Sequence, residues 1–137
     1  MGMPEAEPTI PSWLANRAAI APTATAIVAP GRIPLSYRRL YALIEQTGES
    51  LNRLGVGRND RVSIVLPNGP EMAAAFLAVS SVATSAPLNP AYRANEFDFA
   101  LSDLRASALI VRAGFDSPAR AAARGRGVRI IELSPLL

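Results

Sequence analysis

The amino-acid sequence predicts an α/β protein with a mostly parallel sheet that helices cover on both faces. After residue 36, segments with helical apolar spacing alternate strictly with short apolar segments typical of strands. The strand segments are apolar at almost every position, as is typical of parallel strands buried on both faces. Half of the 137 residues are hydrophobic, which is enough for the core of one ordinary domain.

The N-terminal residues predict a lead-in followed by a short helix. Residues 1–9 are polar and contain two prolines, so we expect a lead-in to a single α/β domain at 10–137. Ser12 has a side chain suited to capping a helix N-terminus, and we expect it to be the N-cap. The expected helix has three residues on one apolar face: Trp13, Leu14 and Ile20.

Two β-rich segments, 25–29 and 33–35, predict a small N-terminal β-hairpin. The sequence Pro-Gly-Arg at 30–32 is typical of the turn between them. Pro34 has no backbone N–H, so the second strand is expected to be short or to lie at an edge.

The alternating elements begin with a helix that Ser36 is expected to cap and Gly55 to follow at its C-terminus. The proline at position 70 fits the first turn of the next helix. The remaining elements follow from apolar runs and turn residues. Strands are expected at 60–66, 108–111 and 128–133, an extended proline-broken segment at 85–90, and helices at 70–79, 95–101 and 116–125.

The residue composition excludes several kinds of chemistry within this chain. All 14 basic residues are arginines, and there is no Lys, His or Cys. A histidine base, a Schiff-base lysine, a thiolate nucleophile and a cysteine metal site are therefore absent. We expect no metal-binding residues, and the lack of cysteine fits a cytoplasmic protein.

The net charge of +3 raises the alternative of a nucleic-acid-binding protein. The arginines are scattered along the chain and form no basic cluster, so no nucleic-acid partner is expected. No apolar run reaches the length of about 18 residues that a membrane-spanning helix needs, so no membrane span is expected.

Three segments, in order and at matching spacing, resemble motifs of the acyl-adenylate-forming (AMP-binding) superfamily. This superfamily includes acyl-CoA synthetases, nonribosomal-peptide adenylation domains and luciferases. The segments are Leu-Ser-Tyr-Arg-Arg-Leu at 35–40, Leu-Gly-Val-Gly-Arg-Asn-Asp-Arg-Val at 54–62, and Leu-Pro-Asn-Gly-Pro-Glu at 66–71 together with Pro-Leu-Asn-Pro-Ala-Tyr-Arg at 87–93. The resemblance covers about residues 10–133, and residues 83–92 and 96–99 look most like oxalate- and fatty-acid-type CoA ligases.

The resemblance implies a parent acyl-CoA synthetase that joins a carboxylate to CoA, using ATP and Mg²⁺ and releasing AMP and pyrophosphate. Four parts of the family's chemistry have no counterpart in this sequence: the phosphate loop that ends in Pro-Lys-Gly, the Thr-Glu pair, the ribose-binding Asp and the catalytic Lys of the mobile C-terminal domain. We therefore expect an N-terminal scaffold portion, an incomplete part of a larger N-terminal domain, with no catalytic residue and no bound cofactor of its own.

The expected partners are the remaining N-terminal domain and the mobile C-terminal domain of the enzyme. Alone, the chain is expected to self-associate, because a domain separated from its neighbours exposes apolar surface. An alternative is a non-catalytic truncated paralogue that acts as an interaction module. The reading frame beyond Leu137 distinguishes the two, because an enzyme would continue into the phosphate loop.

Arg93 is the one residue expected to bind a cofactor. In CoA ligases the basic segment after the Asn-Pro pair lies near the CoA phosphates, and a guanidinium can pair with a phosphate through two hydrogen bonds. The alternative is a solvated arginine near a helix start. For Tyr37 we favour packing, and for Asp60 and for residues 67–69 we favour a role in turns.

Overall fold

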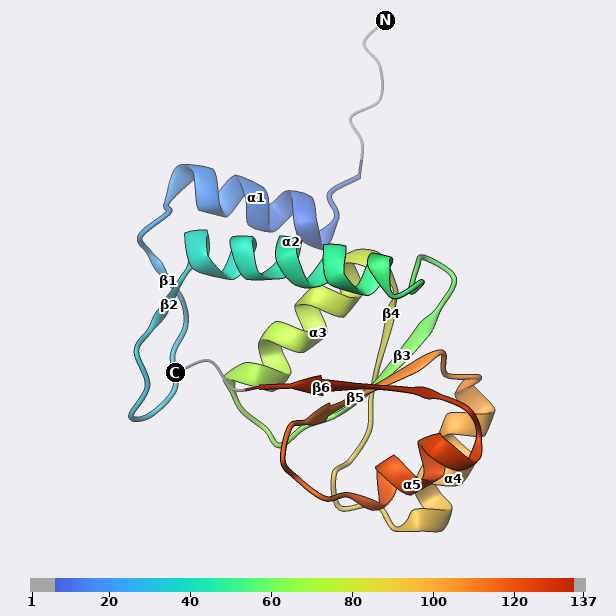
Figure 1. Ribbon diagram of the computed structural model, residues 1–137. Helices are drawn as coiled ribbons and strands as arrows, with labels where there is room; N and C mark the ends of the chain where they lie inside the picture. Colours follow the sequence, from blue (N-terminus) through green and yellow to red (C-terminus); the bar gives the residue numbers. More distant parts are fainter. Residues whose placement is uncertain (1–6, 135–137) are drawn as a thin grey trace, which may run out of the picture.

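The computed structural model of the protein describes residues 7–134 and has the predicted alternation of helices and strands (Figure 1). Its elements in chain order are α1 (Ile10–Ile20), β1 (Thr25–Ile27), β2 (Leu35–Ser36), α2 (Tyr37–Arg53), β3 (Arg61–Val65), α3 (Pro70–Val82), β4 (Thr84–Pro87), α4 (Ala94–Leu104), β5 (Ala108–Arg112), α5 (Pro118–Gly125) and β6 (Arg129–Leu133).

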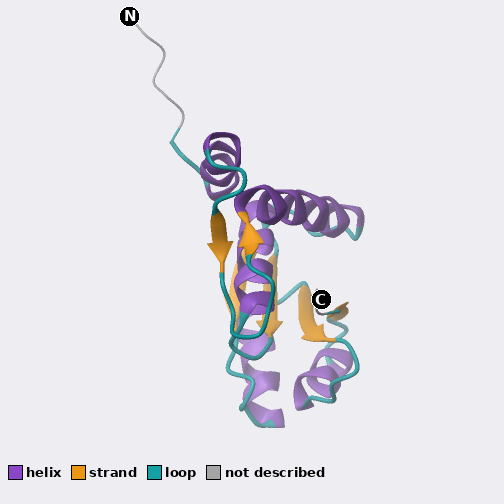
Figure 2. Cartoon of the chain, turned by 90° about the vertical axis from the view of Figure 1, so that its left-hand side faces the viewer, coloured by secondary structure: helices purple, strands orange, loops and turns teal. Residues whose placement is uncertain are grey.

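The main sheet has four strands in the order β4-β3-β5-β6, and every neighbouring pair is parallel. Helices α2 and α3 pack on one face, and α4 and α5 pack on the other. Strands β1 and β2 form a separate antiparallel pair, the predicted hairpin, visible beside α3 in Figure 2. The predicted fold class is therefore confirmed.

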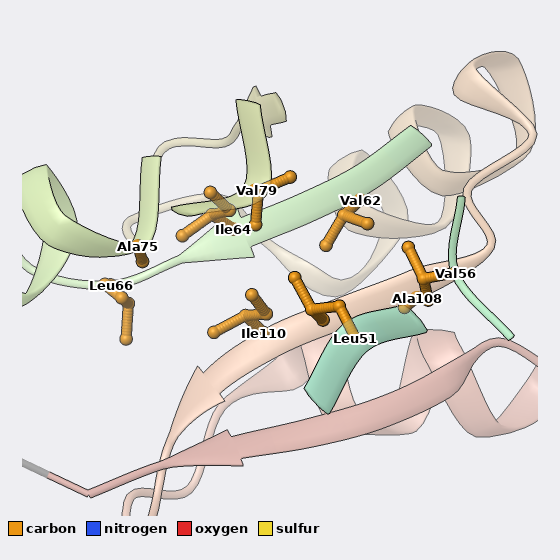
Figure 3. Packing of buried hydrophobic residues seen from close by; sticks show 9 residues of the cluster. All are labelled: Leu51, Val56, Val62, Ile64, Leu66, Ala75, Val79, Ala108 and Ile110. Carbon is orange, nitrogen blue, oxygen red and sulfur yellow. The ribbon is translucent and has the colours of Figure 1, made fainter. Parts of the chain in front are cut away.

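The core forms on both sides of β3 and β5, whose side chains alternate between two clusters. Toward α2 and α3, Val62, Ile64 and Ile110 pack against Leu51 and against small residues of α3 (Figure 3). Toward α4 and α5, a second cluster contains Val65, Leu109, Val111, Phe97 and Leu101. All of these side chains are at most 6% exposed, and burying a side chain of this kind contributes about 1.5–3 kcal/mol.

Helix α2 passes very close to the end of α3, and a glycine makes this approach possible. Gly48 is buried in the middle of α2, and a Cβ there would lie 3.1 Å from a methyl carbon of Val82. Helix α1 then packs on the outer side of both helices, where Leu14, Leu40, Ile44 and Ala78 form a third cluster. The N-terminal region is therefore attached to the sheet through α2 and α3.

The prediction that Ser12 caps α1 is wrong, because Thr9 is the N-cap. Thr9 Oγ1 accepts the backbone N–H of Ser12 at 3.2 Å, and Ser12 Oγ accepts the backbone N–H of Thr9 at 2.8 Å. This reciprocal capping box satisfies two N–H groups that a helix start leaves free. The predicted apolar face is also wrong in part: Leu14 is buried, whereas Trp13 is 50% and Ile20 is 67% exposed.

The predicted limits of α2 are confirmed. The Ser36 side chain accepts the backbone N–H of Arg39 at 3.3 Å. Gly55 follows the helix with φ of 85°, in the left-handed region that glycine adopts without strain.

Asp60 and Arg61 connect three segments at the amino edge of the sheet, where the strands begin. The Asp60 carboxylate accepts the backbone N–H of Gly57 at 2.7 Å and the hydroxyl of Ser107 at 2.6 Å. The Arg61 guanidinium donates to the carbonyl oxygens of Asn59, Leu104 and Arg105. These contacts fix the start of β3 against the loop that enters β5.

The hydrogen bonds from Ser107 and from the Gly57 amide hold the pKa of Asp60 below its ordinary value. A carboxyl whose pKa is lower in the folded state stabilises the protein above its unfolded pKa of about 4, and this contribution is lost as the pH falls. We predict that Asp60→Asn lowers the urea midpoint at pH 7 and that the difference from wild type shrinks below about pH 4. Asp103→Asn, at an exposed site on α4, is the control and should change the midpoint little. A constant deficit for Asp60→Asn from pH 7 to pH 2.5 would contradict the prediction.

Candidate functional site

The candidate site lies at the carboxyl edge of the sheet, where the parallel strands end. After β3 the chain continues into α3 on one face of the sheet, and after β5 it continues into α5 on the other. Because β3 and β5 are neighbours, their loops leave the same edge in opposite directions, which makes the position between them the topological switch point of the sheet. Open α/β sheets bind ligands at such switch points.

An ion pair joins the hairpin to this edge. Arg32, in the β1–β2 connection, places Nη2 2.8 Å from Oε1 of Glu71, which lies in the first turn of α3. Burial acts to raise the pKa of Glu71, but the Arg32 hydrogen bond, the backbone N–H and the charges of Arg32 and Arg112 outweigh it. The pKa of Glu71 is therefore lowered, and the residue is a carboxylate at neutral pH.

Two arginines lie at the carboxyl end of β5 and its following loop. Arg112, the last residue of β5, places its guanidinium carbon 4.6 Å from the ring centre of Phe115. Arg120 of α5 donates to the carbonyl oxygens of Phe115 and Arg112, each at 2.8 Å, and also pairs with Glu132 of β6. These bonds attach the β5–α5 loop to the end of the sheet and fix its shape.

The loop after β4 carries Arg93, and local contacts hold this loop rigidly. The Asn89 side chain accepts the backbone N–H of Ala91 at 2.9 Å, which forms an Asx turn. The ring of Tyr92 lies edge-on to Phe97, with 5.6 Å between ring centres. Arg93 is the N-cap residue of α4, and its backbone N–H donates to Glu96 at 3.1 Å. Its side chain is exposed, and the loop lies at the carboxyl edge of the sheet.

The other residues singled out from the sequence fall in different places. Residues 67–69 form the exposed loop at the carboxyl end of β3, at the candidate site. Asp60 lies at the opposite edge of the sheet. Tyr37 is half-buried at the start of α2, edge-on to Trp13 with ring centres 6.4 Å apart, and 5.4 Å from the Arg17 guanidinium carbon. Tyr37 therefore packs within the N-terminal region.

The Arg32–Glu71 pair and the role of Arg120 were not predicted from the sequence. Arg32 and Glu71 lie in separate elements, and only the fold brings them together. The one local signal was the position of Glu71 beside the N-terminus of α3, where a carboxylate is favoured.

Across residues 7–134, no group of three or more His, Cys, Asp or Glu side chains is arranged to hold a metal ion. In the same part of the chain, no helix combines the length and the apolar character needed to cross a membrane.

Comparison with known proteins decides the family. Residues 14–134 match the family model described as AMP-binding enzyme, which is most of the chain. The chain belongs to the AMP-binding enzyme family. The resemblance to acyl-adenylate-forming enzymes that the three sequence motifs indicated is therefore confirmed.

Several relatives of this chain are CoA ligases. It is 38% identical over 117 residues to an oxalate–CoA ligase of Arabidopsis thaliana, covering 84% of this chain and 23% of the relative. It is 32% identical over 92 residues to the long-chain-fatty-acid–CoA ligase FadD13 of Mycobacterium tuberculosis, covering 66% of this chain and 18% of the relative. A solved fatty acyl CoA synthetase of Mycobacterium tuberculosis superposes with a TM-score of 0.73 at 28% identity, covering 85% of this chain and 23% of that one.

The Arg32–Glu71 pair predicts a local effect on the hairpin. We expect Glu71→Gln to speed amide hydrogen exchange at Arg32 up to about fivefold, because a partly exposed ion pair contributes at most about 1 kcal/mol. Since the pKa of Glu71 is lowered by folding, the wild-type protection should be present at neutral pH and decline below about pH 4.

The matched control for this prediction is Glu49→Gln, which removes an exposed i,i+4 pair with Arg53 on α2. It should leave exchange in the hairpin unchanged. Equal exchange rates at Arg32 in Glu71→Gln and in wild type would show that the ion pair does not hold the hairpin.

Proposed function

We propose that this chain is the N-terminal scaffold portion of an ATP-dependent acyl-CoA synthetase and that it is not active alone. The parent reaction converts a carboxylate, ATP and CoA into acyl-CoA, AMP and pyrophosphate. The observation that carries the proposal is the relation between match and length: most of this chain aligns with CoA ligases, yet it spans only 23% and 18% of the two relatives described above.

The composition of the chain supports the second part of this proposal. Adenylate formation needs cationic groups and Mg²⁺ around the phosphates of ATP. The chain has no lysine, and within residues 7–134 no carboxylate cluster suits a metal ion. In the parent enzyme, ATP and Mg²⁺ would be bound by residues outside this chain, and the parallel sheet would support them.

Arg93 is the residue of this chain that we propose to contact CoA. Its side chain is exposed, its backbone is fixed at the N-terminus of α4, and it lies at the carboxyl edge of the sheet. A guanidinium there can form two hydrogen bonds to a phosphate of the CoA nucleotide. Glu96 binds the backbone N–H of Arg93 and leaves the guanidinium available.

The proposal predicts that the purified chain does not catalyse ATP–pyrophosphate exchange with oxalate or with fatty acids. The same chain joined through Leu137 to the remainder of the Arabidopsis oxalate–CoA ligase should restore exchange with oxalate. The measurement is incorporation of labelled pyrophosphate into ATP. Exchange by the chain alone would contradict the proposal.

The role of Arg93 predicts a selective loss in that joined enzyme. Arg93→Ala should raise KM for CoA about tenfold, because a hydrogen bond to a charged group contributes about 1.5 kcal/mol. Adenylate formation, measured by pyrophosphate exchange, should be unchanged because it does not involve CoA. Arg105→Ala, at the opposite edge of the sheet, is the control. An unchanged KM for CoA in Arg93→Ala would remove Arg93 from the CoA site.

A further inference from the structure

An apolar groove of about 410 Å³ lies between the hairpin, α2, α3 and the end of β6. Its floor is formed by small and aliphatic residues, among them Leu43 of α2 and Ala74 and Ala78 of α3. The hairpin contributes Ile33, which is 78% exposed, and β6 contributes Leu133. The lining also contains polar side chains, among them the Arg32–Glu71 ion pair. The groove thus joins the N-terminal region to the edge of the main sheet through a mostly apolar surface.

The two edges of the main sheet differ in their ability to accept another strand. Thr84 and Leu88 donate their backbone N–H groups toward β3, so the backbone nitrogen atoms of the alternate residues Ser85 and Pro87 face outward. Pro87 has no N–H, and the Ser85 hydroxyl is bonded to the carbonyl oxygen of Phe76. Proline is typical of an edge strand that ends a sheet. Strand β4 is therefore a poor edge for a further strand.

Strand β6 forms the other edge and has no such protection. Its sequence, Arg-Ile-Ile-Glu-Leu, contains no proline, and it pairs with β5 along its full length. Within residues 7–134 no element pairs with its outer side. A regular, unpaired edge strand readily accepts another strand. Its last residue, Leu133, also lines the groove, so the open edge and the groove are continuous.

We infer that the groove and the outer edge of β6 together form the docking surface for the polypeptide that completes the enzyme. This inference rests on the proposed function. The matching segments are 23% and 18% of the two relatives' length, so a large partner segment is available. Strand β6 ends at Leu133, which lines the groove, so a polypeptide that continues from β6 would start beside this surface.

The chemistry of the surface specifies the segment that fits it. The apolar floor calls for aliphatic side chains, since burying them there removes apolar area from water on both partners. Arg39 of α2 lines the groove and is exposed, and its guanidinium forms no ion pair or hydrogen bond within residues 7–134. The occupant is therefore an aliphatic segment with an acidic side chain opposite Arg39, accompanied by a strand that pairs with β6.

A binding experiment with matched variants tests this inference. The Arabidopsis oxalate–CoA ligase lacking its matching segment is co-expressed with this chain, and the affinity of the purified pieces is measured. We expect Arg39→Glu and Ile33→Asp to weaken binding at least tenfold. The controls are Arg124→Glu on α5, across the sheet, and Val28→Asp, an exposed hairpin residue outside the groove. Equal affinity for groove variants and controls would overturn the inference.

A second measurement does not require the remainder to fold by itself. The chain has no cysteine, so a single thiol can be placed at will. In the joined protein, a thiol at Ala42→Cys, in the groove, should react with a maleimide at least tenfold more slowly than in the chain alone. A thiol at Ala121→Cys, on α5, should react at the same rate in both. Unchanged reactivity of Ala42→Cys in the joined protein would overturn the inference.

The outcomes separate this inference from the proposed function. A complex that binds through the groove but forms no acyl-CoA would contradict the proposed function and retain the docking surface. If Arg39→Glu and Ile33→Asp leave acyl-CoA formation intact, the proposed function is retained and the docking surface is contradicted. Homodimers that depend on the groove and persist with excess remainder would assign the surface to a second copy and overturn the inference.

Discussion

A parallel strand buried on both faces leaves no side chain free for solvent, and β3 and β5 are in this position. Each strand sends alternate side chains into the α2–α3 cluster and the α4–α5 cluster. Removing either helical layer would therefore expose the apolar side chains on the strand face that it covers. The close approach of α2 to α3 at Gly48 and the attachment of α1 and the hairpin follow from this central pair. The switch point at the carboxyl edge exists because the loops after β3 and β5 leave toward opposite layers.

The same constraint explains why most of the fold was predictable. The buried residues of β3 and β5 are apolar at consecutive positions except for Ser63, and this pattern is visible in the sequence without any knowledge of partners. The start of α1 was not predictable in the same way. Thr9 and Ser12 are both good capping residues three positions apart, and in the structure each hydrogen-bonds to the other. Capping preference alone does not distinguish the two residues, so Ser12 was expected where Thr9 is the N-cap. Leu14 is the buried side chain of α1.

The candidate site was predictable only where its position depends on chain order. Arg93 follows β4 in the sequence, so its place at the carboxyl edge follows from the parallel sheet. The contact between Arg32 and Glu71 depends on how the hairpin folds back over α3, and no local sequence pattern predicts that the two side chains meet.

Arg61 and Arg120 illustrate a related limit. Each guanidinium donates to three acceptors around one edge of the sheet, which is a use of arginine that composition alone does not reveal.

The strand order also matters while the chain is being synthesised. Strand β3 emerges first, β4 pairs with it and closes one side with Pro87, and then β5 and β6 are added in turn on the other side. No strand has to be inserted between two that are already paired. The sheet can therefore assemble in the order of translation, without breaking hydrogen bonds formed earlier. This reduces the time during which unpaired apolar strands of the nascent chain are exposed to aggregation.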